Sequence, residues 1–70
     1  MPNAIELIVN GYVSLNDRRA LDDLRMQRRK LALDLKARTD FDCRTTIQQI
    51  EEDIIVIEAG LAQMDGAAKT

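Results

Sequence analysis

Carboxylates with a regular spacing are the first side chains of this sequence that could support chemistry. Asp40, Asp42 and Glu51 occupy the first, third and twelfth positions of a calcium-loop pattern. Arg44 occupies a position where that loop needs a ligand, and Thr45 stands where it needs a glycine for its sharp turn. We therefore interpret the carboxylates as helix caps and predict no calcium site.

Cys43 is the single cysteine, and the chain contains no histidine. A thiolate nucleophile or metal ligand needs such a partner or several further sulfur ligands. Cys43 is therefore expected to pack within a helix seam. Adjacent carboxylates such as Asp22 and Asp23 point to different sides of a helix, so they cannot act as an acid/base pair across a substrate. The glycines are too scattered to form a phosphate-binding loop. The sequence thus predicts no enzyme, no cofactor and no metal site.

A group of cations is the sharpest functional signal. This basic stripe consists of Arg18, Arg25, Arg29 and Lys36, which share one side of a predicted helix. Such a row can follow a phosphate backbone and so indicates a nucleic-acid regulator. The alternative, which we favour, is that the stripe pairs with acidic side chains of a neighbouring helix and leaves little free positive potential.

A short helix is expected first, over about residues 4–13. Asn3 and Glu6 have the spacing of a capping box that starts such a helix. The alternative is a hairpin, because Asn10-Gly11 has the composition of a tight turn. Capping residues at 14–17 predict a bend after this segment, with a continuous helix as the alternative.

Two longer helices are expected next, over about residues 17–38 and 43–65. The turn between them, at 39–42, lacks helical periodicity, and Phe41 is placed to pack against the start of the following helix. Gly66 is a plausible C′ residue and begins a frayed tail at 66–70. We predict one all-α domain over residues 1–70.

Each long helix carries a row of apolar residues at alternating gaps of three and four, the spacing of helices that pack lengthwise in a coiled coil. Arg28 interrupts the row and either directs its guanidinium to the edge or fixes the register. We call the row the interaction seam: Leu21, Leu24, Leu31, Leu35, Ile47, Ile50, Ile54, Ile57, Leu61 and Met64.

The charges favour an antiparallel, coiled-coil-like hairpin of these two helices. Residues 17–38 carry eight basic and four acidic side chains, whereas residues 40–58 carry six acidic and one basic. Folding back at the turn places opposite one another positions whose numbers sum to roughly 80. The expected pairs are Leu24 with Ile57, Leu31 with Ile50, Arg25 with Glu58, Arg18 with Asp65, and Ala20 with Gly60.

The chain is small for independent stability. It has 70 residues, of which 46% are hydrophobic and only 3% aromatic, and a lone cysteine provides no internal disulfide. Small chains of this kind often gain stability from a partner subunit. Apolar residues outside the seam form a possible oligomer face of a homodimeric bundle, the alternative being a monomer with scattered exposed apolar residues. This oligomer face comprises Met26, Leu33, Ala37, Ile55, Ala59 and Ala62.

These features favour a small non-catalytic helical protein-interaction module or chaperone-like adaptor that self-associates. The predicted layout resembles ROP-type RNA-binding dimers and hairpin co-chaperones of bacterial secretion systems, without a residue-by-residue motif match to either. The ROP-type resemblance implies the alternative function, nucleic-acid regulation through the basic stripe. The lone cysteine indicates a reducing compartment, so the cytoplasm is expected. The amino terminus lacks the features of a signal peptide, and no apolar run has membrane-spanning length.

Overall fold

Three α-helices make up the fold. The computed structural model describes residues 3–38 and 42–68. Within those residues it contains α1 (Ala4–Ser14), α2 (Arg18–Lys36) and α3 (Arg44–Ala68), and no strand. The all-α prediction is confirmed. The roles predicted for Asp40 and Phe41 lie outside the described residues.

The start of α1 is set by a side-chain cap. Asn3 Oδ1 accepts a hydrogen bond from the backbone N–H of Glu6 at 3.1 Å, which satisfies one of the free donors of the first turn. The helix then runs through Asn10 and Gly11, so this segment contains no hairpin turn.

A tight cap separates α1 from α2. Asn16 adopts a left-handed conformation, with φ 56°, which asparagine tolerates better than most residues. The N–H of Asp17 donates to the carbonyl of Tyr12 at 2.9 Å, and that of Asn16 donates to the carbonyl of Val13 at 3.0 Å, the bond pattern of a Schellman motif. Asp17 Oδ1 in turn accepts from the N–H of Ala20 at 3.2 Å and caps α2. The chain therefore bends here, and the continuous-helix alternative is wrong.

The end of α3 differs from the prediction. Gly66 is not a C′ residue, because α3 continues through it to Ala68. No described glycine has a positive φ. The residues after Gly66 are two alanines, the strongest helix formers, so the local sequence carries the helix past the glycine.

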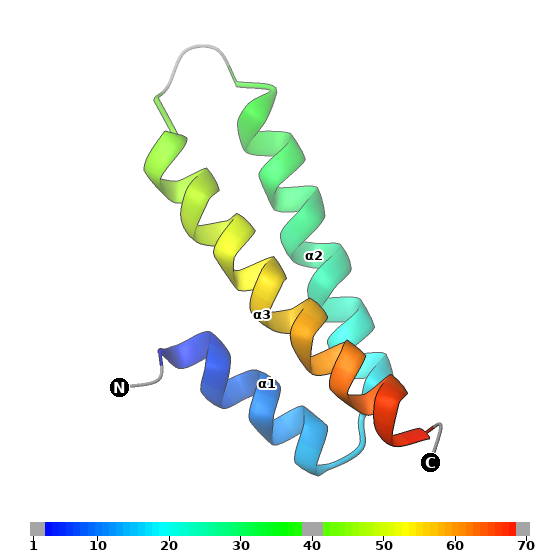
Figure 1. Cartoon of the computed structure of the whole chain (residues 1–70). Helices are drawn as coiled ribbons and strands as arrows, with labels where there is room; N and C mark the ends of the chain where they lie inside the picture. The colour runs from blue at the N-terminus through cyan, green and yellow to red at the C-terminus, as the bar shows by residue number, and fades with distance from the viewer. Residues whose placement is uncertain (1–2, 39–41, 69–70) are drawn as a thin grey trace.

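The three helices form an elongated bundle of 48 × 25 × 15 Å. α2 and α3 lie side by side (Figure 1). Arg18 at the start of α2 pairs with Asp65 near the end of α3, and Lys36 at the end of α2 pairs with Glu51 nearer the start of α3. α1 packs mainly on α3 and less on α2. It covers the end of the bundle where α2 begins, and leaves the other end uncovered (Figure 1).

The hydrophobic core lies where all three helices meet. Leu21 of α2 and Ile57 of α3 are fully buried there. Ala32 of α2 and Ile50 of α3 are buried as well. The buried cluster at the three-helix end comprises Ile5, Val9, Leu21, Ile57, Leu61 and Met64, with Tyr12, Val13, Leu24 and Val56 packed against it.

Candidate functional site

The interaction seam is unevenly buried. Leu31 is the least covered of its ten members, at 43% exposed, and it is the partner that we expected for Ile50. Four of the buried members belong to the cluster at the end that α1 covers, and Ile50 is buried beyond that end (Figure 1). Five seam residues are buried (Leu21, Ile50, Ile57, Leu61 and Met64) and four are half-buried (Leu24, Leu35, Ile47 and Ile54).

Gly60 lies in a closer contact than the sequence indicated. We predicted that it faces Ala20 and lets α2 approach α3. A Cβ built on Gly60 would lie 2.5 Å from Cγ1 of Val9, and 3.5 Å and 3.7 Å from side-chain atoms of Val13 and Leu21. The tightest contact at Gly60 therefore belongs to α1, which reaches the backbone of α3 because the glycine has no side chain.

Ion pairs link α2 to α3. Arg18 pairs with Asp65 as predicted from the sequence. Arg25 does not reach Glu58 among the described residues: its Nη2 lies 3.5 Å from Asp22 of its own helix. Its Nε is buried and lacks a hydrogen-bond partner. The predicted Arg25–Glu58 pair is therefore wrong, because an acidic residue one turn earlier on α2 competes for the same guanidinium.

The basic stripe is largely paired with carboxylates. Lys36 Nζ lies 2.9 Å from Oε1 of Glu51 on α3, and Arg18 contacts Asp22 as well as Asp65. Arg29 is the stripe member without an ion pair in the part of the chain that the structure describes. It lines a groove between α2 and α3 of about 220 Å³, together with Ala32, Leu33, Lys36, Glu51 and Ile54.

Arg28 of α2 faces Asp53 of α3 beside the first two turns of α1. Its Nε lies 3.9 Å from Oδ2 of Asp53 on α3, and the two side chains are 31% and 17% exposed. Asp53 also accepts a hydrogen bond from Gln49 at 3.1 Å. The Arg28–Asp53 ion pair is thus partly shielded from solvent. The three residues line a groove of about 370 Å³ with Asn3, Ala4, Ile5 and Ile8 of α1.

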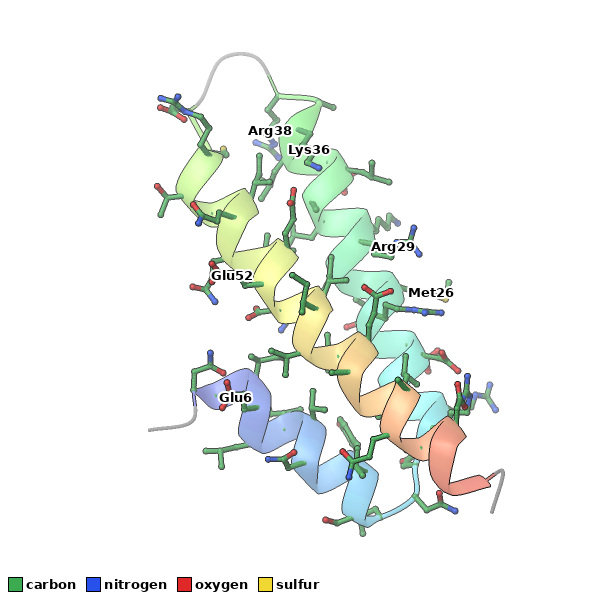
Figure 2. All side chains as sticks on the ribbon, in the orientation of Figure 1. Glu6, Met26, Arg29, Lys36, Arg38 and Glu52 are labelled. Carbon is green, nitrogen blue, oxygen red and sulfur yellow. The ribbon has the colours of Figure 1, made fainter. Side chains whose placement is uncertain are left out.

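The predicted oligomer face is exposed in the single chain. Met26, Leu33 and Ile55 are 66%, 68% and 65% exposed. The alanines of this face, Ala37, Ala59 and Ala62, are exposed as well. Met26 projects from the side of α2 that faces away from α3 (Figure 2).

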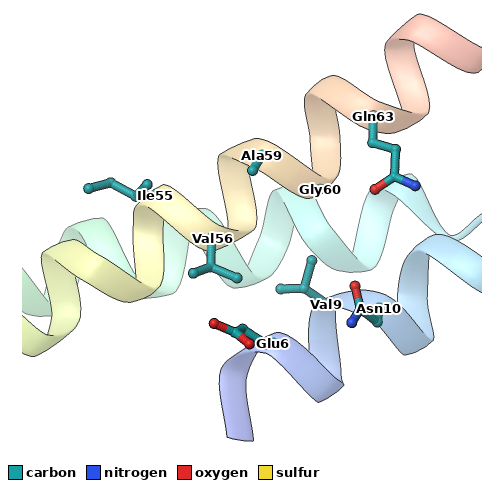
Figure 3. A pocket seen from close by; sticks show the side chains of 8 residues that line it. All are labelled: Glu6, Val9, Asn10, Ile55, Val56, Ala59, Gly60 and Gln63. Atoms are coloured by element: carbon teal, nitrogen blue, oxygen red, sulfur yellow. The ribbon is translucent and has the colours of Figure 1, made fainter. Parts of the chain in front are cut away.

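The α3 part of this face borders a groove. Ile55 and Ala59 lie at the rim of a groove between α1 and α3 (Figure 3). The groove has a volume of about 350 Å³, and Val9 and Gly60 meet within it. On the α1 side it is lined by Glu6 and Asn10. Glu6 is the one ionisable side chain of its lining.

The outer surface of α1 was missed by the sequence reasoning. Leu7, Ile8 and Leu15 are 60%, 44% and 75% exposed. The signal was available in the sequence, because α1 has one charged residue, Glu6, in eleven. A helix that is apolar on several sides buries only one of them against its own chain.

Cys43 is a free, half-buried cysteine directly before α3. Among the described residues there is no group of three or more histidine, cysteine, aspartate or glutamate side chains that could hold a metal ion. Glu51 of the calcium-loop pattern pairs with Lys36, and Asp42 pairs with Arg44 at 3.0 Å. The side-chain hydrogen bond from Arg44 and a second from its backbone N–H lower the pKa of Asp42.

No family model, curated protein or solved structure matches this chain. Function is therefore inferred from the residues and their geometry. No helix of the described residues is both long enough and apolar enough to cross a membrane.

Proposed function

We propose that this protein is a small non-catalytic helical interaction module, a chaperone-like adaptor of the cytoplasm that self-associates as a homodimer. One observation carries this proposal. The single chain leaves seven large apolar side chains exposed while burying eight apolar residues. Exposed apolar residues that gather on one helix face, as Leu7, Ile8 and Leu15 do on α1, are typical of surfaces that another chain covers. The seven are Leu7, Ile8, Leu15, Met26, Leu31, Leu33 and Ile55.

The bundle geometry supports a binding role. We interpret α2 and α3 as an antiparallel, coiled-coil-like hairpin that acts as a rigid scaffold, with α1 closing one end. Helical hairpins bind partners by presenting apolar rows to a further helix. A chain of 70 residues without a disulfide gains stability when such a row is buried against a second subunit.

Two separate apolar surfaces favour an adaptor over a simple dimer. One is the predicted oligomer face, which includes Met26 and Leu33 on α2 and Ile55 on α3. The other is the outer surface of α1, with Leu7 and Leu15. If one surface holds a second copy, the other remains available for a different protein.

Nucleic-acid regulation of the ROP type is the weaker candidate. Arg18, Arg25 and Lys36 already pair with carboxylates, so three of the four stripe cations have reduced positive potential. A phosphate backbone would have to displace those carboxylates.

Sedimentation velocity and light scattering on the full chain test the proposal. The mass is expected to change from that of one chain to that of two as the concentration rises through the micromolar range. A mobility-shift assay with double-stranded DNA and RNA is run on the same samples. A mass of one chain at every concentration contradicts self-association, and salt-sensitive nucleic-acid binding favours the regulator.

A further inference from the structure

The groove of about 220 Å³ between α2 and α3 carries opposite charges on its two sides. The α2 side has two cations, Arg29 and Lys36 (Figure 2), and the α3 side has the carboxylate of Glu51. All of the lining residues belong to α2 and α3, so the groove is not shared with α1. We call it the charged groove: Arg29, Ala32, Leu33 and Lys36 of α2, with Glu51 and Ile54 of α3.

One cation and one carboxylate at the charged groove are left without an opposite charge. Arg29 and Glu58 are exposed, and neither forms an ion pair among the residues that the structure describes. Glu58 follows Ile54 by four residues and Glu51 by seven, so it continues the α3 side of the groove. Lys36 and Glu51, by contrast, pair across the groove at 2.9 Å.

Arg29 and Glu58 lie at the same level of the bundle. The ion pairs at the two ends of α2 show that residue numbers fall along α3 as they rise along α2. Arg29 precedes Lys36 by seven residues, and Glu58 follows Glu51 by seven. If a second copy is turned by 180° about an axis parallel to the helices, every residue keeps its level and the two sides of the groove change places. Arg29 of one copy then lies over Glu58 of the other.

The two signs of charge select the partner of the charged groove. A single acidic helix would be attracted by the α2 side and repelled by the α3 side, and a single basic helix would meet the reverse. A partner that satisfies both sides must carry a basic and an acidic helix side by side in the opposite order. A second copy in the orientation just described presents that pair of helices. A dimer with α2 over α2 would instead oppose like charges.

The two long helices also supply the area that a dimer needs. α2 has 19 residues, which corresponds to a length of about 28 Å, and two adjacent helices are about 20 Å wide. A face of these dimensions is of the order of the roughly 800 Å² per partner found in standard interfaces. Leu33 is 68% exposed at this face, so a large apolar side chain becomes covered there as well.

We propose that a second copy of this chain docks on the charged groove, with Arg29 of each copy pairing with Glu58 of the other. This inference rests on the proposed self-association and names the surface and the symmetry responsible for it. The outer surface of α1 then stays free for a different protein partner.

Two charge reversals on separate chains test the contact. Arg29→Glu opposes two carboxylates across the dimer, and Glu58→Arg opposes two cations. Each variant alone should therefore have a dimer dissociation constant raised by about tenfold or more at low salt. In an equal mixture, the two variants present opposite charges to each other at both contacts. Sedimentation velocity of the mixture should show a dimer that forms at nearly the wild-type concentration. An ion pair within one chain cannot produce this recovery, because the two changes are on different chains.

Lys30→Glu and Glu52→Arg are the matched controls. They make the same changes of charge on the same two helices, and both side chains are exposed. Each lies one residue from a lining residue and so points to a different side of its helix, which means that the dissociation constant should stay unchanged. A second comparison uses apolar residues. Leu33→Gln should weaken the dimer, whereas Leu7→Gln on α1, where the leucine is 60% exposed, should not.

The outcomes separate this interface from self-association itself. A dimer that tolerates Arg29→Glu and Glu58→Arg overturns the interface but leaves self-association standing. A mixture that does not recover the dimer, or an equal loss in the two controls, does the same. A wild-type protein that is monomeric at every concentration overturns both.

Discussion

Val9 of α1 packs directly against the backbone of Gly60 in α3, with its Cγ1 lying 2.5 Å from the position that a Cβ of residue 60 would occupy. Val9 is 3% exposed, and Gly60 is buried. Through this contact α1 joins the buried cluster that contains Ile57.

Gly60→Ala should therefore destabilise the protein although alanine is the better helix former. The new methyl cannot coexist with Val9 in its present position, and such overpacking costs about 1–3 kcal/mol. The higher helix propensity of alanine offsets about 1 kcal/mol of this overpacking cost. Urea unfolding followed by circular dichroism measures the net loss. Val9→Ala in the same background should recover part of it, and additive effects of the two changes would contradict the contact.

Ile57→Asp should abolish cooperative folding. Ile57 is 0% exposed, and a buried unpaired charge together with the lost side chain exceeds the roughly 3–5 kcal/mol that a core of this size supplies. The control is Ile55→Asp two residues earlier, where the side chain is 65% exposed. Far-ultraviolet circular dichroism and thermal melting should show a native-like Ile55 variant and an unfolded Ile57 variant. Equal melting of the two would contradict the placement of the core.

Lys36 and Glu51 should be energetically coupled, and Arg25 and Glu58 should not. The Lys36–Glu51 pair measures 2.9 Å with both side chains about half exposed, and exposed pairs of this kind contribute about 0.2–1 kcal/mol. Double-mutant cycles with charge reversals, at low salt, measure the coupling free energy of each pair. Coupling of Arg25 with Glu58, without coupling of Lys36 with Glu51, would contradict the register of α2 against α3 in this structure.

Binding to DNA or RNA should be undetectable at physiological salt. The paired carboxylates of the basic stripe lower its potential, and the net charge of the chain is −2. Glu51→Gln releases Lys36 and so tests whether the carboxylates are responsible. If that variant gains binding that falls steeply with salt, the stripe is a masked phosphate site. Tight binding by the unmodified protein, lost in Arg29→Ala, would contradict the proposed function.

Asp42 should titrate below the usual range of an aspartate. Its side-chain hydrogen bond from Arg44 lowers the pKa, followed in effect by the bond from the Arg44 backbone N–H. A folded-state pKa below the unfolded value means that this stabilisation is present above the unfolded pKa and is lost as the pH falls through the folded one. Carbon-detected NMR titration gives the midpoint. Arg44→Ala should raise the midpoint of Asp42, and an unchanged midpoint would exclude the pair in solution.

Local sequence determined the helices and most of their boundaries. Apolar spacing gave α2 and α3, and the caps at Asn3 and Asp17 follow from side chains that bond backbone groups three residues away. These interactions are short-range, so a single sequence contains them. The end of α3 was missed because the prediction gave Gly66 more weight than the alanines that follow it.

Tertiary structure alone decided how those helices share their apolar surface. Periodicity places Leu31 in the seam, but the packing of the helices leaves it 43% exposed while Ile50 of the same seam is buried. Val9 and Gly60 lie far apart in the sequence, and the residues around either one do not predict the contact between them. Their contact depends on the shapes of two helix surfaces in one crossing geometry, which a one-dimensional pattern does not encode. For the same reason the pattern overlooked the contact of Gly60 with Val9 and the outer face of α1.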